Sequence, residues 1–161
     1  MDSLFESNLV QNTAFGAVAL WQFAASYYKL RAKVEGPSLP AAMLLLPMVF
    51  HDATVQAIAD RNRDGALLKA LAADRTIVVG LQQRVQVHVD RTIRSLAFAA
   101  SAGLIRLDKR SGVSVVPLVA VQPFKYASPE CQRVLKAADR LGHSLALSGF
   151  ETCCSLLGVR F

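Results

Sequence analysis

The sequence predicts a mainly α-helical protein with a small β-hairpin, folded as one winged-helix-like domain over residues 1–161. Apolar residues recur at helical spacing in several stretches, most clearly over residues 12–33 and 128–149. Directly after a helical stretch over residues 91–102, a glycine is followed by two short apolar runs that flank a basic turn, which is the pattern of strand, turn and strand. A helix followed at once by such a hairpin is typical of a winged helix, so this fold is the prediction.

The composition excludes a disordered chain and indicates a partner. Of the 161 residues, 53% are hydrophobic and 19% are charged, which is ample apolar surface to offset the entropy of folding. The length suits one domain. A small domain has a large surface for its volume, so it cannot hide this much apolar area inside. We therefore expect part of the apolar surface to lie against another protein chain.

The sequence predicts a cytoplasmic protein without a membrane span. A helix that crosses a bilayer needs about 20 consecutive apolar residues. The longest apolar run, residues 39–50, is shorter than this and contains Pro40 and Pro47. Asp2 and Glu6 stand where a secretory leader would carry basic residues, so no leader is expected.

The first part of the chain, residues 1–89, is predicted to be helical. Asn12 or Thr13 can cap a helix that continues to about Lys33, because both side chains accept hydrogen bonds from backbone amides. The apolar segment that starts at Leu39 is expected to stop near Pro47, since proline disfavours helix in the residue before it. Two shorter helices should follow, over residues 52–59, with Asp52 as the cap, and over residues 66–72.

Residues 90–120 are predicted to be the winged-helix-like part. We expect the long helical stretch that begins at Asp74 to divide near Val89-Asp90, with Asp90 capping a helix from Arg91 to Ala102. Helical spacing predicts that its buried face consists of Ile93, Leu96, Ala97 and Ala100. Gly103 and Gly112 are placed where the end of the helix and the hairpin turn require a positive φ.

Residues 128–161 are predicted to form a long helix and a short apolar tail. Ser128 caps the helix, Pro129 occupies its first turn, and Gly149 ends it. Its inner face is expected to contain Cys131, Val134 or Leu135, Ala138, Leu141 and Leu145. The opposite side is expected to be a solvated basic stripe of Arg133, Lys136, Arg140 and His143.

The positive charge is concentrated in the middle of the chain. Residues 84–110 contain six basic and two acidic residues, a surplus of four within a total net charge of +6. Four of these side chains are candidates for contact with phosphates or with an acidic protein surface: Arg91, Arg94, Lys109 and Arg110. The alternative is a solvated helix face and a polar turn. Asn and Gln, which commonly read bases, do not occur in residues 91–102.

The motifs of several enzyme classes are missing from the sequence, so we predict a protein that is not an enzyme and uses no cofactor or metal. The chain contains neither a phosphate-binding loop that ends in Gly-Lys-Ser/Thr, nor a nucleophile elbow, nor a zinc-protease helix. The pair His51-Asp52 lacks the further His/Asp pairs that a metal site would need. His88 and Asp90 lie two residues apart in a predicted helix, so their side chains point apart. The three cysteines are too few for a disulfide framework and are expected to be buried free thiols: Cys131, Cys153 and Cys154.

Short motifs along almost the whole chain resemble the middle components of bacterial three-component ABC-ATPase systems. The resemblance begins with Asn12-Thr13-Ala14-Phe15 and Trp21-Gln22-Phe23. It continues through the apolar-Pro-apolar-His block of residues 44–51 and ends with Leu157-Gly158-Val159-Arg160. The positions that match the family are Asn12, Trp21, Pro47, His51, Arg84, Gly103, Gly142 and Gly158.

The resemblance implies an adaptor rather than an enzyme. Such small proteins are encoded between an SMC/Rad50-like ABC ATPase and an effector, often a nuclease, in antiphage or anti-plasmid defence operons such as the Lamassu group. By this resemblance, the chain would bridge the two partners, or act as a winged-helix accessory comparable to those of SMC complexes, with DNA as a further partner reached through the complex. Trp21, His51 and Arg84 would then be either internal structural residues or partner contacts. The competing hypothesis is a free-standing winged-helix DNA-binding regulator.

Overall fold

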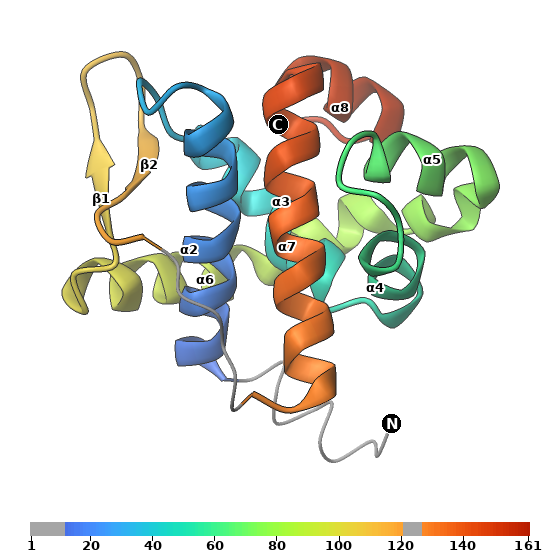
Figure 1. Cartoon of the computed structure of the whole chain (residues 1–161), viewed down its shortest axis with the longest axis horizontal. Helices are drawn as coiled ribbons and strands as arrows, with labels where there is room; N and C mark the ends of the chain where they lie inside the picture. Colours follow the sequence, from blue (N-terminus) through green and yellow to red (C-terminus); the bar gives the residue numbers. More distant parts are fainter. Residues whose placement is uncertain (1–11, 121–126) are drawn as a thin grey trace.

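The computed structural model describes residues 12–120 and 127–161, and its elements carry the labels of Figure 1. Helices α2 (Thr13–Leu30) and α7 (Pro129–Ser148) lie side by side, with α6 (Leu81–Ser101) crossing next to α2 and the hairpin beyond it (Figure 1). Helices α4 and α5 pack on the other side of α7. The prediction of a mainly α-helical fold with one small hairpin is confirmed.

Helix α2 is enclosed by other elements on most of its surface. Its predicted cap is confirmed, since the Asn12 side chain accepts a hydrogen bond of 3.0 Å from the Phe15 amide. Eight of its residues are buried, which agrees with its low polar content: Gly16, Ala17, Ala19, Leu20, Trp21, Phe23, Ala24 and Ser26. The helix ends at Leu30, three residues before the expected Lys33, because Ala32 and Lys33 adopt a positive φ.

Helix α3 (Leu39–Val49) is capped by Ser38, whose hydroxyl accepts a hydrogen bond from the Ala41 amide, and it continues through Pro47. The predicted stop at Pro47 is therefore wrong by two residues. Proline has no main-chain N–H, so α3 lacks the helical hydrogen bond that position 47 would otherwise donate. The burial of Leu44, Leu45 and Met48 in the core offsets that loss.

Helices α4 (Asp52–Ala59) and α5 (Ala66–Ala73) follow the predicted ranges closely. The cap position of α4 is occupied by His51 and not by Asp52, which lies in the first turn and accepts a hydrogen bond from Gln56. Among the described residues, no single helix is both long and apolar enough to cross a bilayer. Helices α3 and α4 pass that test only as a pair, with a bend of 100° between them.

Helix α6 is continuous, and the predicted division near Val89-Asp90 is wrong. The break lies earlier, at Val79-Gly80, between a short 3-10 helix η1 (Arg75–Val78) and α6. Gly80 has a φ of 70°, which ends one helix and lets the next begin. Asp90 is consequently an interior helix residue and not a cap, and the expected boundary between residues 1–89 and 90–120 falls inside α6. Residues 81–101 contain neither glycine nor proline, so nothing in them interrupts the helix.

The buried face of α6 also differs from the prediction. Only Leu96 of the four expected residues is buried, whereas Ile93, Ala97 and Ala100 are exposed. The buried residues of this region are Thr92, Ser95, Leu96 and Ala99. Small residues explain the difference: a side-chain carbon added to Gly16 of α2 would collide with the Ser95 hydroxyl. The two helices approach so closely that the more polar, small-residue face of α6 is the one that fits against α2.

The hairpin consists of antiparallel strands β1 (Ile105–Asp108) and β2 (Ser114–Pro117). Gly103 and Gly112 have φ values of 74° and 85°, as expected. The free edge of β2 pairs with the segment before α3: the Leu39 amide donates to the Val113 carbonyl at 2.9 Å, and the Val115 amide donates to the Pro37 carbonyl at 2.8 Å. The hairpin is therefore attached to the start of α3.

Helix α7 has the predicted ends and inner face. The Ser128 hydroxyl caps the Cys131 amide, and Gly149 with a φ of 83° ends the helix. All the predicted inner residues except Cys131, which is half-buried, are buried: Val134, Leu135, Ala138, Leu141 and Leu145. The tail expected after Gly149 is mostly the helix α8 (Phe150–Leu157). Apolar spacing over so few residues does not distinguish a helix from an extended tail.

Candidate interaction surface

The two arginines predicted as contacts on α6 have no acidic partner among the described residues. Arg94 is exposed, and its Nε lies 3.5 Å from the Asp90 carbonyl oxygen. Arg91 is half-buried. The described ion pairs include neither side chain. Both guanidinium groups are therefore available to an outside anion.

The hairpin turn holds its own charge pair. The carboxylate of Asp108 accepts hydrogen bonds from the Arg110 amide at 3.0 Å and from Arg110 Nη2 at 2.6 Å, and Arg106 Nη2 lies 3.9 Å away. These hydrogen bonds, together with the nearby positive charges, hold the pKa of Asp108 at about 2. Arg110 and Lys109 are both exposed, but Arg110 is paired with Asp108 within the turn.

The predicted basic residues do not converge on a single point. The hairpin leaves the end of α6 and rises along α2, so its tip lies away from α6 in Figure 1. Arg91 and Arg94 belong to the middle of α6, and Lys109 and Arg110 belong to that tip. The structure therefore separates the four candidates into a helix pair and a turn pair.

Trp21 lies in the core and fixes the end of the hairpin. It is 7% exposed, and its indole Nε1 donates a hydrogen bond of 2.9 Å to the Val119 carbonyl. The side chain therefore has a structural role.

His51 and Arg84 lie near each other, and both are half-buried. Arg84 donates hydrogen bonds to the carbonyls of Ile77 at 2.9 Å and Val79 at 3.2 Å. It thereby supplies donors to main-chain carbonyls at the end of η1. His51 Nδ1 lies 2.8 Å from the Thr54 hydroxyl. Burial, followed by the Arg84 charge, lowers the pKa of His51, which keeps the ring neutral near pH 7. Both residues have internal partners, and both retain some exposed surface.

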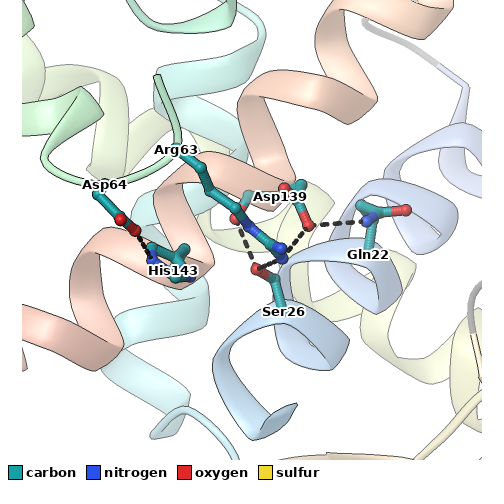
Figure 2. A network of polar contacts seen from close by, with 6 residues as sticks. All are labelled: Gln22, Ser26, Arg63, Asp64, Asp139 and His143. Atoms are coloured by element: carbon teal, nitrogen blue, oxygen red, sulfur yellow. Dashed lines mark hydrogen bonds and ion pairs between the residues drawn. The ribbon is translucent and has the colours of Figure 1, made fainter. Parts of the chain in front are cut away.

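The predicted solvated stripe of α7 is only partly correct, because Arg133 and Lys136 are exposed whereas Arg140 and His143 are half-buried. Arg133 pairs with Asp60 at 3.0 Å, and Arg140 donates a hydrogen bond to the Ala59 carbonyl. His143 Nε2 donates to the Asp64 carboxylate at 2.7 Å (Figure 2). Of the four residues, only Lys136 is exposed and makes no hydrogen bond or ion pair with another described residue. Periodicity showed the stripe but could not show that the α4–α5 connection lies against it.

The polar network in Figure 2 joins three elements. Arg63 Nη2, from the α4–α5 connection, donates to the Asp139 carboxylate of α7 at 2.8 Å and to the Ser26 hydroxyl of α2 at 3.0 Å. Ser26 in turn donates to the Asp139 carbonyl at 2.8 Å, and Gln22 donates to the Asp139 carboxylate at 3.3 Å. Each of the six side chains drawn contacts at least one other through a hydrogen bond or ion pair, which indicates a structural clamp and not a reactive site.

The outward face of α6 carries the feature that sequence reasoning missed. Val89 is 37% and Ile93 is 50% exposed, and Ala97 and Ala100, at helical spacing on the same side, are exposed as well. The apolar periodicity of residues 93–100 predicts a core face, but in the structure this side of α6 faces outward. We call the residues Val89, Ile93, Ala97 and Ala100 the α6 stripe.

The described residues contain no group of three or more His, Cys, Asp or Glu side chains able to hold a metal. Cys153 is buried, and burial raises the pKa of its thiol to about 11, so the thiol is a poor nucleophile. In residues 12–120 and 127–161, the arrangement offers surfaces for binding and no assembled catalytic group.

Comparison with known proteins agrees with these features. No curated protein and no solved structure matches the chain significantly. The family described as ABC-three component (ABC-3C) system Middle Component 3 matches residues 2–161, nearly the whole sequence. The chain therefore belongs to the middle component 3 family of ABC-three-component systems.

Proposed function

We propose that the chain is a non-catalytic adaptor that bridges an SMC-like ABC ATPase and an effector nuclease in an antiphage or anti-plasmid defence complex of the Lamassu type. The family membership carries this proposal, because a middle component belongs with other components of a three-component system. The α6 stripe supports it, since large exposed apolar surfaces commonly mark contacts between proteins. The adaptor acts in the cytoplasm.

The test is co-expression of this chain, bearing an affinity tag, with the ATPase and the effector encoded beside it. We expect both to be retained on the tag together, and each to be retained less when the other is omitted. In cells, an in-frame deletion of this chain should abolish protection against phage while both neighbours are still produced. Full protection in the deletion strain would contradict the proposal.

A free-standing winged-helix DNA-binding regulator is the second candidate. The pairing of β2 with the segment before α3 favours it, because together with β1 this gives three extended segments packed beside a long helix. This candidate requires that the purified chain alone binds duplex DNA, with an affinity that falls steeply as salt rises. Arg94→Ala and Lys109→Ala should each weaken that binding. Fluorescence anisotropy with labelled duplexes decides between the two candidates.

A further inference from the structure

We infer that the end of the molecule formed by the hairpin turn and the α2–α3 connection binds the phosphate backbone of duplex DNA. The inference goes beyond the adaptor function, because it gives this chain a DNA contact of its own. It also separates the contact from α6, where the sequence predicted one.

Two short segments hold most of the positive surplus of the chain. Residues 29–35 contain three basic residues and one acidic residue, and residues 106–110 contain the same numbers. Each segment therefore has a net charge of +2, and together they supply +4 of the +6 of the whole chain. All six basic residues are exposed, and we call them the basic end: Lys29, Arg31, Lys33, Arg106, Lys109 and Arg110.

The fold brings the two segments to the same end of the molecule, where the α2–α3 connection lies beside the hairpin (Figure 1). Tyr28, near the end of α2, relates one to the other. Its carbonyl accepts a hydrogen bond of 2.9 Å from the Lys33 amide. The pKa of Arg110 is raised, chiefly by its hydrogen bond to Asp108, with a smaller contribution from the charge of Tyr28. Lys33 and Arg110 therefore both lie close to Tyr28.

The lysines of the basic end are available to an outside anion. The two acidic residues of these segments each pair with an arginine of the same segment, at 2.8 Å and 2.6 Å. The ion pairs of the described residues include none of the lysines Lys29, Lys33 and Lys109. A lysine ammonium group lies at the end of a flexible four-carbon stem, so each of the three can move to meet a phosphate.

The composition of this end fits DNA better than it fits a protein. Lysine is depleted at protein–protein interfaces, whereas Lys and Arg supply many of the contacts to DNA phosphates. The hairpin turn, residues 108–112, contains no apolar side chain. The exposed apolar residues nearby, Leu30, Val34 and Leu107, each stand between two charged neighbours in the sequence. Duplex DNA presents one negative charge per about 1.7 Å of its axis, so it can engage several of these cations together.

Fluorescence anisotropy measures the binding of the purified full chain to a labelled DNA duplex over a series of salt concentrations. The double change Lys33→Glu and Lys109→Glu should weaken binding about a hundredfold at low salt. Lys33→Gln alone should reduce the dependence of log affinity on log salt by about one unit, the value for one lost phosphate contact. Lys136→Gln is the matched control, since Lys136 is an exposed lysine of α7, and it should change neither quantity. Thermal unfolding confirms that each variant is folded.

Unchanged DNA binding by the double variant would overturn the inference. So would a loss of binding confined to Arg94→Gln, because the DNA would then lie on α6, as the regulator requires. Binding to phosphatidylserine vesicles without binding to the duplex would identify a membrane surface instead and would also contradict it. If the unchanged chain does not bind the duplex, the inference fails, but the adaptor function stands as long as the tagged chain retains the ATPase and the effector.

Discussion

The indole Nε1 of Trp21 and the carbonyl oxygen of Val119 lie 2.9 Å apart and are joined by a hydrogen bond, although 98 positions separate the two residues. This bond fastens the chain that leaves β2 to the middle of α2. Trp21 therefore stabilises the fold through this hydrogen bond as well as through the burial of its apolar ring.

Trp21→Phe should therefore destabilise the fold by about 1–2 kcal/mol, because it removes the hydrogen bond and part of the buried ring. Urea denaturation measures the loss. Hydrogen exchange of the Leu118 amide, which donates to the Leu104 carbonyl, should become faster. Unchanged exchange at Leu118 would show that the bond does not hold the hairpin.

Gly142→Ala should destabilise the protein by about 3 kcal/mol, at the upper end of typical overpacking costs. A side-chain carbon at position 142 would collide with the Phe23 carbonyl oxygen and would lie 3.2 Å from the Ser26 side chain. Because the obstacle is backbone, it cannot rotate away. The control is Lys136→Ala on the same helix, which should change the free energy of unfolding by less than about 0.5 kcal/mol.

The pKa of Asp108 should be close to 2 in the folded protein, against an ordinary value of 3.8. The depressed pKa means that the turn gains stability above pH 4 and loses it as the pH falls from about 4 to about 2. Carbon-13 NMR of the carboxyl group measures the titration. Arg110→Gln should move the pKa back toward 3.8, and a pKa that stays near 2 in this variant would contradict the pairing.

Asp139→Asn should loosen the α4–α5 connection while leaving the core folded. The change removes the charge that Arg63 contacts, and since this pair is partly exposed the loss should be about 1 kcal/mol or less. Amide exchange over residues 60–65 should accelerate, whereas that of α3 should not. Equal acceleration in both segments would indicate global destabilisation instead.

Cys153 should react with thiol reagents more slowly than Cys131, because Cys153 is buried and its pKa is raised to about 11. Its neutral thiol is favoured in the fold, so the associated stability is complete below about pH 9 and is lost as the pH rises toward 11. Mass spectrometry after timed alkylation gives the order of reaction. Rapid labelling of Cys153 under native conditions would contradict its burial.

Local signals predicted the elements better than they predicted which faces are buried. Asn12, Ser128, Gly103 and Gly149 act within a few residues of their own position, and each marks the helix end that it was predicted to mark. The predicted division of α6 was wrong because Asp90 can cap a helix only where one begins. Helix α6 begins earlier, at Leu81, directly after Gly80.

The errors at the surface come from contacts between distant parts of the chain. The small residues Gly16 and Ser95 decide which side of α6 faces α2, although Ile93 is the more hydrophobic residue. Likewise, Arg133 and His143 find Asp60 and Asp64 more than 70 positions away. Periodicity along one helix contains no information about such neighbours, so the exposed α6 stripe could not be foreseen.

The packing of α2 against α7 has a consequence for synthesis. Gln22 and Asp139, which join these helices, are 117 residues apart in the chain. At a translation rate of about 5–20 residues per second, the ribosome therefore needs roughly ten seconds to supply the second helix after the first. During that interval the apolar face of α2 that α7 will bury is exposed on the nascent chain. Chaperones or a neighbouring nascent subunit can bind this face before the domain folds.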